Sequence, residues 1–248
     1  MGQANGRHIG ILLHSVEGAL LCYSTAVHEA MRWLGKHRHP TITMSGRAMD
    51  EALAAWDADD HAVIRAMLAE DLGALARAGA EFFVLPDNTA HIALETDGPD
   101  LPLPGLHIAE EVATSAVARG FAKVGILGTR WTMEGPVYRR ACEARGIGWA
   151  VPDEATRKRL HAIIMDELCM GVFEQRSIEE FRNAVDALRA AGCDCVALVC
   201  TEIPLIINDA NSSLPVLDST RLLARAAVDV ALGERPLPTW CGGPVTDS

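Results

Sequence analysis

Residues 188–205 of the chain read Leu-Arg-Ala-Ala-Gly-Cys-Asp-Cys-Val-Ala-Leu-Val-Cys-Thr-Glu-Ile-Pro-Leu. The helical periodicity before this stretch ends at Gly192, and glycine is favoured just past the end of a helix. The apolar run at residues 195–199 then predicts a buried strand, and polar residues begin directly after it, at Cys200. A helix, a glycine and a short buried strand in this order are typical of α/β folds with a parallel sheet.

The same unit occurs earlier in the chain. Leu-Ala-Arg-Ala-Gly at residues 75–79 matches residues 188–192, and Arg-His-Ile-Gly-Ile-Leu at 7–12 matches Ala-Lys-Val-Gly-Ile-Leu at 122–127. Because both matches occur in the same order along the chain, they favour an internal duplication over a chance similarity.

The duplication makes Asp87 and Cys200 equivalent positions, since each lies eight residues after the glycine of its own repeat, Gly79 or Gly192. Each also follows a predicted strand directly. Because open α/β sheets bind their ligands at the carboxyl ends of the strands, we expect both side chains to lie in a binding site.

The rest of the chain continues the alternation of apolar runs and helical segments. Residues 98–105, Gly-Pro-Asp-Leu-Pro-Leu-Pro-Gly, exclude a helix or a central strand and are the best candidate for a domain boundary. We expect a first α/β domain over residues 8–98 with about 206–248, and a second over 106–205. The strands are expected at 8–13, 41–44, 82–86, 123–127 and 195–199, and the helices at about 18–34, 57–78, 108–119 and 178–191.

Composition excludes several classes of protein. The chain has 248 residues, 49% of them hydrophobic, and 33 acidic against 22 basic residues give a net charge of −11. This charge repels a phosphate backbone, so we expect no nucleic-acid partner. No apolar run reaches the roughly 18–20 residues that span a bilayer, and the first residues do not resemble a signal peptide, so we expect no membrane contact and a cytoplasmic location.

The seven cysteines are an odd number scattered along the chain, which is not typical of a disulfide framework. We expect reduced thiols. Cys193 and Cys195 have no second ligand pair at zinc spacing, so we expect no metal.

Cys200 and Asp87 carry the chemistry that the pattern indicates. A thiol between a buried strand and a helix start lies at the positive end of a helix dipole, which favours thiolate and makes Cys200 a candidate nucleophile or base. The alternative for Cys200 is a small buried apolar side chain. The alternative for Asp87 is a carboxylate that caps the next helix.

Two motifs resemble those of the aspartate/glutamate racemase superfamily. Leu-Pro-Asp-Asn-Thr-Ala-His at residues 85–91 resembles the family's Cys-Asn-Thr-(small)-His motif, and Val-Cys-Thr-Glu-Ile-Pro-Leu at 199–205 resembles its Gly-Cys-Thr-Glu-Ile-Pro-Leu motif. Gly-Ile-Leu-Gly-Thr at 125–129 and Leu-Asp-Ser-Thr at 217–220 are similar to two further family segments. The resemblance covers residues 8 to 230.

This resemblance implies two similar doubly wound parallel-sheet domains related by a pseudo-twofold axis, with an active site in the cleft between them and no cofactor. It also implies a homodimer, to which Trp33, Trp56 and Trp131 could contribute surface. In the family, two cysteines on opposite sides of the substrate α-carbon exchange its proton. The second cysteine corresponds to Cys200, while the first falls on Asp87, which is the main departure from the family pattern.

The departure leaves three functions open. Reference pKa values of about 3.9 for Asp and 8.5 for Cys place protonated Asp87 with a Cys200 thiolate roughly 6 kcal/mol above the resting pair. The leading hypothesis is a racemase or epimerase of a small acidic amino acid or related carboxylate that uses Asp87 and Cys200. The second is a lyase, decarboxylase or isomerase that uses Cys200 alone, with Asp87 orienting the substrate. The third is a non-catalytic binding protein.

Further candidate residues lie beside the expected strand ends. His14 occupies the repeat position of Thr129 and is a candidate for substrate binding, although a surface or capping histidine is the favoured alternative. His91 could orient Asp87 or bind substrate, and Glu202 could activate Cys200 or only complement a helix start. Hydroxyl and amide groups at helix N-termini suit a carboxylate but also serve as caps. The residues of that kind are Ser15, Asn88, Thr89, Thr129 and Thr201.

Overall fold

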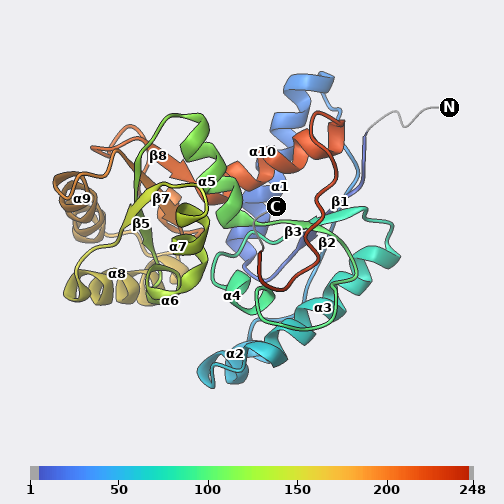
Figure 1. Cartoon of the computed structure of the whole chain (residues 1–248), viewed down its shortest axis with the longest axis horizontal. Coiled ribbons are helices and arrows are strands. Elements are labelled where there is room, and N and C mark those ends of the chain that lie inside the picture. The colour runs from blue at the N-terminus through green and yellow to red at the C-terminus, as the bar shows by residue number, and fades with distance from the viewer. Residues whose placement is uncertain (1–5, 246–248) are drawn as a thin grey trace. The chain divides into compact units, whose positions relative to one another are not determined.

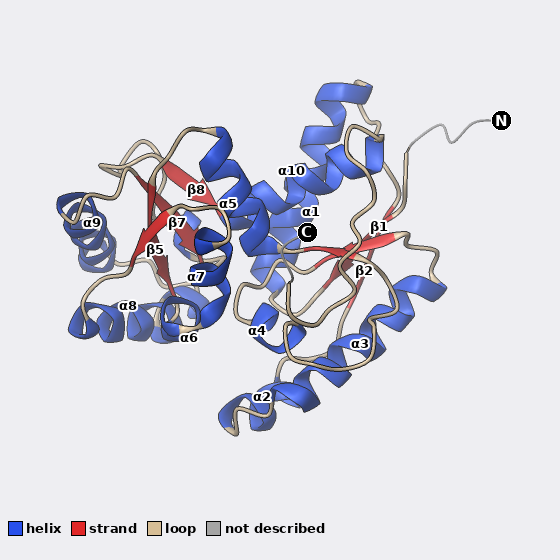
Figure 2. Cartoon of the chain, viewed as in Figure 1, coloured by secondary structure: helices blue, strands red, loops and turns tan. Residues whose placement is uncertain are grey.

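The alternation of apolar runs and helical segments folds into two units in the computed structural model, which describes residues 6–245. The first unit combines the residues up to Ile108 with those from Thr220 onward, and the second is continuous, Ala109–Ser219. In each unit the strands form a sheet with helices on its faces (Figures 1 and 2). The predicted α/β fold with two parallel-sheet domains is confirmed.

Each unit contains a four-stranded parallel sheet. The strands of the first are β1 (Ile9–Leu12), β2 (Ile42–Ser45), β3 (Phe82–Val84) and β4 (Gly105–Leu106), and those of the second are β5 (Lys123–Gly128), β6 (Gly148–Ala150), β7 (Cys195–Val199) and β8 (Val216–Asp218). Their orders are β2-β1-β3-β4 and β6-β5-β7-β8. The two sheets therefore have the same topology, and β3 and β7, the strands that precede Asp87 and Cys200, occupy the same place in it.

Helices cover both faces of the first sheet because its strands alternate between two apolar clusters. Phe82 and Val84 pack with α1 and α10, while Phe83 and Leu85 pack with α3 and α4. Such burial on both faces is characteristic of parallel sheets. The helices are α1 (Val16–Leu34), α2 (Asp50–Asp57), α3 (His61–Arg77), α4 (Ala90–Leu94) and α10 (Ser219–Leu232).

The second unit is built in the same way. Val196 and Leu198 of β7 pack against Leu160 of α8 and Phe181 of α9. Within residues 6–245, no helix is both long and apolar enough to cross a membrane. The helices of this unit are α5 (Ile108–Ala118), α6 (Arg130–Glu134), α7 (Pro136–Glu143), α8 (Glu154–Asp166) and α9 (Gln175–Ala190), with short 3-10 helices η1 (Leu168–Met170) and η2 (Ile203–Leu205).

Two features differ from the sequence-based expectation. The helix expected over residues 57–78 is present as α3 but begins only at His61, because the preceding helix α2, which was not expected, ends at Asp57 and Asp59 has a φ of 51°. The side chain of Asp60 then accepts a hydrogen bond from the N–H of Val63 and starts α3. The chain also returns to the first unit at Thr220 rather than near residue 206, because β8 extends the second sheet first.

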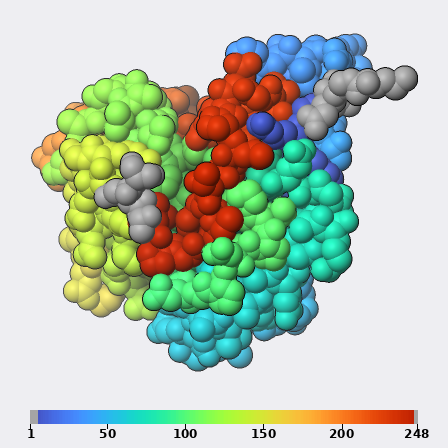
Figure 3. Space-filling model, turned by 45° about the vertical axis from the view of Figure 1, so that its right-hand side comes forward, coloured from blue at the N-terminus to red at the C-terminus, as the bar shows by residue number. Residues whose placement is uncertain are grey.

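A C-terminal strap, residues 239–243, lies along the surface of the first unit (Figure 3). The N–H of Gly105 donates to the carbonyl of Trp240 over 2.9 Å, and the N–H of Gly243 donates to the carbonyl of Leu94 over 2.9 Å. The strap therefore joins the end of α4 to the start of β4, just behind the segment that carries Asp87.

Candidate active site

Asp87 follows β3 after Leu85 and Pro86, and its carboxylate has two partners. Oδ2 accepts a hydrogen bond from Nδ1 of His14 over 2.6 Å, and Oδ1 accepts one from the N–H of Ala90 over 3.1 Å. The side chains of His14 and Asp87 are only 9% and 13% exposed. Asp87 therefore caps α4, as the structural alternative predicted, and also forms a buried pair with the residue that follows β1.

The two partners stabilise the charged forms of each other. Burial raises the pKa of Asp87, but the charge of His14 and its hydrogen bond outweigh burial and hold the pKa below the ordinary 3.8. Burial lowers the pKa of His14, but the charge of Asp87, the hydrogen bond to it and the charge of Asp71 leave the pKa above the ordinary 6.5. At neutral pH the carboxylate of Asp87 is therefore ionised.

His14 is not the surface or capping histidine that was the favoured alternative. Leu13 and His14 follow β1 where β1 lies between β2 and β3, which turns the imidazole towards Asp87. Its ring meets the edge of Trp56 with centroids 6.0 Å apart. Nε2 of His14 is buried and has no hydrogen-bond partner within residues 6–245.

His91 fixes the main chain at Asp87 and not its carboxylate. Nδ1 donates to the carbonyl oxygen of Asp87 over 2.8 Å, and Nε2 accepts from the N–H of Ile108 over 3.4 Å. The ring of Trp240 stacks on His91 at a centroid distance of 6.1 Å and an angle of 12°. Burial, with the nearby His107, lowers the pKa of His91 to about 3, so its imidazole is neutral.

Cys200 follows β7 directly, and its Sγ donates a hydrogen bond to Oε2 of Glu202 over 2.9 Å. Both residues are buried. The helix expected to begin after Cys200 is only the three-residue η2, so no helix dipole of any length favours the thiolate. Burial and the negative charge of Glu202 instead raise the pKa of Cys200 well above 9.0, so the resting side chain is a thiol.

The remaining polar candidates divide into caps and buried groups. The side chain of Ser15 accepts from the N–H of Gly18 and caps α1, and that of Thr129 accepts from the N–H of Thr132 and caps α6. Ser15 and Thr129 are therefore helix caps, which is the alternative that the sequence left open for them. The candidates that lie beside Asp87 and Cys200 in sequence are Asn88 and Thr201, which are buried, and Thr89, which is partly exposed.

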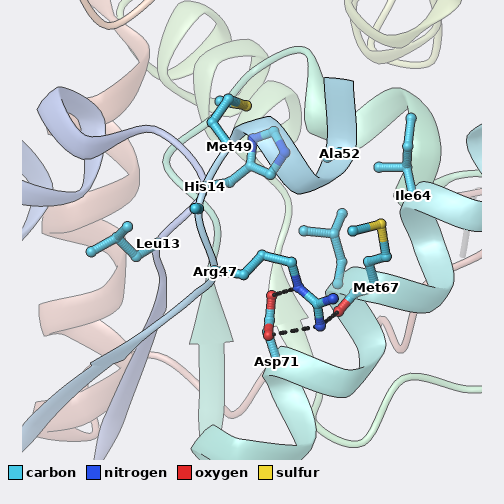
Figure 4. A pocket seen from close by; sticks show the side chains of 10 residues that line it. Leu13, His14, Arg47, Met49, Ala52, Ile64, Met67 and Asp71 are labelled. Carbon is cyan, nitrogen blue, oxygen red and sulfur yellow. Dashed lines mark hydrogen bonds and ion pairs between the residues drawn. The ribbon is translucent and has the colours of Figure 1, made fainter. Parts of the chain in front are cut away.

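A small, open pocket adjoins the Asp87–His14 pair, and His14 is one of its lining residues. Figure 4 shows His14 with Met49 towards one end and the ion pair of Arg47 with Asp71 towards the other. Nε of Arg47 donates to Asp71 over 3.0 Å. Arg47 was not among the residues predicted from the sequence, although its place two residues after β2 is a signal, because β2 ends at the same edge of the sheet as β1 and β3.

The remaining cysteines and the acidic and histidine side chains form neither disulfides nor a metal-binding cluster in the part of the chain that the structure describes. Residues 6–245 include all seven cysteines and contain no disulfide, and four of the cysteines besides Cys200 are buried. Over the same residues, no group of three or more His, Cys, Asp and Glu side chains is arranged to hold a metal ion.

The comparisons with known proteins agree on one family. Residues 11–227 match the family model for Asp/Glu/Hydantoin racemase. A broad specificity amino-acid racemase of Bacillus subtilis (strain 168) is 23% identical over 176 residues, covering 70% of this chain and 74% of that protein. A glutamate racemase of Thermus thermophilus is 28% identical over 180 residues, covering 71% of this chain and 65% of that protein.

Two solved structures share the fold over most of the chain. A structure described as that of an Asp/Glu racemase candidate from Yersinia pestis has a TM-score of 0.81 at 31% identity, covering 91% of this chain and 99% of that one. An aspartate racemase homologue from Pyrococcus horikoshii OT3 has a TM-score of 0.75 at 26% identity, with 91% and 99% covered.

Proposed function

The chain belongs to the Asp/Glu/hydantoin racemase family, as its motifs predicted, and on that premise we propose that it is a cofactor-independent racemase or epimerase of a small acidic amino acid or a related carboxylate. One observation carries the proposal. Asp87 and Cys200 follow the equivalent strands β3 and β7 of two sheets with the same order. In this proposal they serve opposite faces of one substrate α-carbon.

The protonation states of the two residues suit such a reaction. Asp87 is ionised and paired with an imidazole, so its side of the site is basic. Cys200 is a thiol and can supply a proton. The resting protein is therefore ready to remove a proton on the Asp87 side and to deliver one on the Cys200 side, while Glu202, as the acceptor of the thiol hydrogen bond, holds that donor in place.

The substrate class follows from the relatives, which are described as amino-acid and glutamate racemases. We assign the substrate carboxylate to the main-chain and side-chain donors next to the two central residues, since N–H groups beside strand ends suit anions. The residues in question are Asn88, Thr89 and Thr201, whereas the hydroxyls of Ser15 and Thr129 cap α1 and α6 and are not assigned to the substrate.

A second function is favoured by the bonding of Asp87. Both of its carboxylate oxygens already accept hydrogen bonds from the protein. A carboxylate occupied in this way can orient a substrate without accepting its proton. In that case Cys200 alone protonates a carbanion left by loss of another group, as in a lyase or decarboxylase.

The two functions are separated by proton exchange in D2O. Aspartate, glutamate and a panel of α-substituted carboxylic acids are incubated with the protein, and loss of the α-proton and change of configuration are followed by NMR and chiral chromatography. Racemisation with α-deuteration, lost in Cys200→Ala and lost or strongly reduced in Asp87→Asn, supports the racemase. Fragmentation that requires Cys200 but tolerates Asp87→Asn supports the lyase.

Two matched variants control for damage to the fold. Cys241→Ala removes a partly exposed thiol from the first unit, and Asp166→Asn removes an exposed carboxylate at the end of α8. Both are expected to keep the activity of the unaltered protein. No exchange and no fragmentation across the panel contradicts both enzymatic functions. We also propose that the chain acts as a cytoplasmic homodimer, which analytical ultracentrifugation tests for the oligomeric state.

A further inference from the structure

The bonding of the His14–Asp87 pair fixes which ring nitrogen carries hydrogen. Asp87 is ionised, so the 2.6 Å contact requires that Nδ1 of His14 be the donor. In neutral His14 the lone pair therefore lies on Nε2. A carboxylate that holds one nitrogen of an imidazole while the other carries the lone pair is the arrangement of a general base.

Nε2 also has no other task within residues 6–245, because it is buried and accepts or donates no hydrogen bond there. A buried polar atom without a partner lowers stability, so its presence needs an explanation, of which a catalytic role is one. The His14 side chain is 9% exposed and lines the pocket of Figure 4. By contrast, each oxygen of Asp87 already accepts a hydrogen bond.

We infer that Nε2 of His14 is the atom that exchanges a proton with the substrate on the first unit's side, and that Asp87 is a positioning residue that orients the imidazole and stabilises its cation. This inference rests on the proposed function and deepens it. His14 takes the chemical role that the family pattern gives to the first cysteine, from a different strand end.

With His14 instead of Asp87 as the base, the pKa difference between the base and Cys200 becomes much smaller. With reference pKa values, an Asp and a Cys differ by about 4.6 pH units, whereas a His and a Cys differ by about 2. The proton-exchanged state is therefore populated about 400 times more readily with an imidazole than with a carboxylate. The charge of Asp87 raises the pKa of His14 and favours that state further, while burial and Glu202 raise the pKa of Cys200 and oppose it.

The proton transfer balances without any further reactant. The Cα–H bond of the substrate breaks, its proton forms the Nε2–H bond of His14, and its electron pair stays on the α-carbon next to the carboxylate. Sγ of Cys200 then gives its proton to the opposite face and becomes thiolate. The product leaves a protein with an imidazolium and a thiolate, which is the state that accepts the other enantiomer.

Other charges near His14 are few. Asp71 raises its pKa, and Asp71 is itself bound by Arg47, whose guanidinium also contacts Glu70. Asp87 is the one carboxylate bonded directly to the ring among the contacts within residues 6–245. Loss of the charge of Asp87 is therefore expected to lower the pKa of His14 more than loss of any other single group.

The test is the pH dependence of α-proton exchange in D2O, with the substrate that the panel identifies. For the unaltered protein we expect the acid limb of kcat/KM above pH 6.5, since His14 must be neutral to accept a proton. Asp87→Asn is expected to lower the rate and to move this limb to lower pH, because the group that raises the pKa of His14 is lost. A merely structural role for Asp87 does not move the limb.

His14→Ala is expected to lower exchange at least about a hundredfold, the usual range for a general base, and added imidazole is expected to restore part of it. Rescue shows that the variant is folded. His28→Ala, at an exposed histidine of α1, is the matched control and keeps full activity.

The failure of this inference differs from the failure of the proposed function. An acid limb at about pH 4, with Asp87→Asn inactive at every pH and His14→Ala active, makes Asp87 the base and overturns the inference while the racemase stands. If the unaltered protein exchanges no proton from any acid of the panel, the proposed function falls, and the role of His14 falls with it.

Discussion

The thiol of Cys200 donates its hydrogen to a carboxylate only two residues later, with Sγ 2.9 Å from Oε2 of Glu202. Burial is the largest cause of the raised pKa of Cys200, and the charge of Glu202 is the next. Glu202→Gln removes that charge, so we expect the pKa of Cys200 to fall and its alkylation by iodoacetamide at pH 8 to accelerate, about tenfold for each pH unit by which the pKa falls.

Peptide mapping by mass spectrometry isolates Cys200 from the other six cysteines in this measurement. Glu154→Gln, at an exposed carboxylate of α8, is the control and should leave the rate unchanged. An unchanged rate of Cys200 alkylation in Glu202→Gln would mean that the charge of Glu202 does not raise the pKa of the thiol.

His91 makes the stability depend on pH. Its pKa is about 3 in the folded protein and 6.5 in the unfolded chain, so between these values the unfolded chain binds a proton that the folded protein does not. Above pH 6.5, His91 is neutral in both states and does not make the stability depend on pH. Below pH 6.5, the free energy of unfolding falls by up to about 1.4 kcal/mol for each pH unit. We expect His91→Gln to flatten this slope in urea unfolding between pH 4.5 and 7.5.

His28→Gln is the matched control, since His28 is exposed and its removal should leave the slope of the unaltered protein. If the free energy of unfolding of His91→Gln depends on pH as steeply as that of the unaltered protein, the assignment of a neutral, buried imidazole at this position is wrong.

Trp240 ties the C-terminal strap to the segment behind Asp87. Its ring stacks on His91, and its centroid lies 4.8 Å from that of His107. Nε1 also donates to the carbonyl of Gly243 over 3.0 Å. Because the side chain is partly exposed, we expect Trp240→Ala to lower the free energy of unfolding by about 2 kcal/mol, below the range for a fully buried tryptophan.

The control is Trp33→Ala, at a side chain that is 62% exposed, which should change the free energy of unfolding by less than about 0.5 kcal/mol. Equal effects in the two variants argue against the strap as a stabilising element.

Gly46 allows the loop after β2 to approach the chain just before His14. A Cβ at this position lies 1.8 Å from the carbonyl oxygen of Leu13, which is main chain and cannot rotate away. Gly46→Ala is therefore expected to lower the free energy of unfolding by at least about 2 kcal/mol and to displace His14. In Gly73→Ala in α3, the new Cβ meets only the tip of Arg77 at 3.3 Å. This substitution should raise the free energy of unfolding by about 0.5–1 kcal/mol. Thermal unfolding of the two variants is the measurement, and a stable Gly46→Ala contradicts the close approach.

Elements with a strong local pattern could be predicted from the sequence. The run at 195–199 is apolar throughout and bounded by polar residues, and β7 has those bounds. The short strands β6 and β8 were not predicted, because each has three residues, includes half-buried positions and carries no continuous apolar run. Helix α2 was not predicted, and the expected start of α3 was four residues early because the sequence alone did not show the turn at Asp59.

In the candidate site, too, the residues with a local sequence pattern could be predicted and those brought together by tertiary packing could not. The repeat register identified Asp87 and Cys200, because strand ends are marked by apolar runs. The bond between His14 and Asp87 joins residues 73 positions apart, so no local pattern contains it. Arg47 and Trp56 were not associated with the site because they belong to the loop after β2 and to α2, whose approach to His14 depends on tertiary packing.

The discontinuous first unit sets an order on the folding of a growing chain. Strands β1 to β4 leave the ribosome first, but α10 and the strap, which complete their core and edge, leave it last. The continuous second unit is complete well before that, so we expect the middle of the chain to fold before its beginning, the reverse of the usual order. Limited proteolysis of ribosome-bound chains that end at residue 219 and continue into an unstructured linker long enough to fill the exit tunnel tests this, since residues 109–219 should then resist cleavage while residues 6–108 do not.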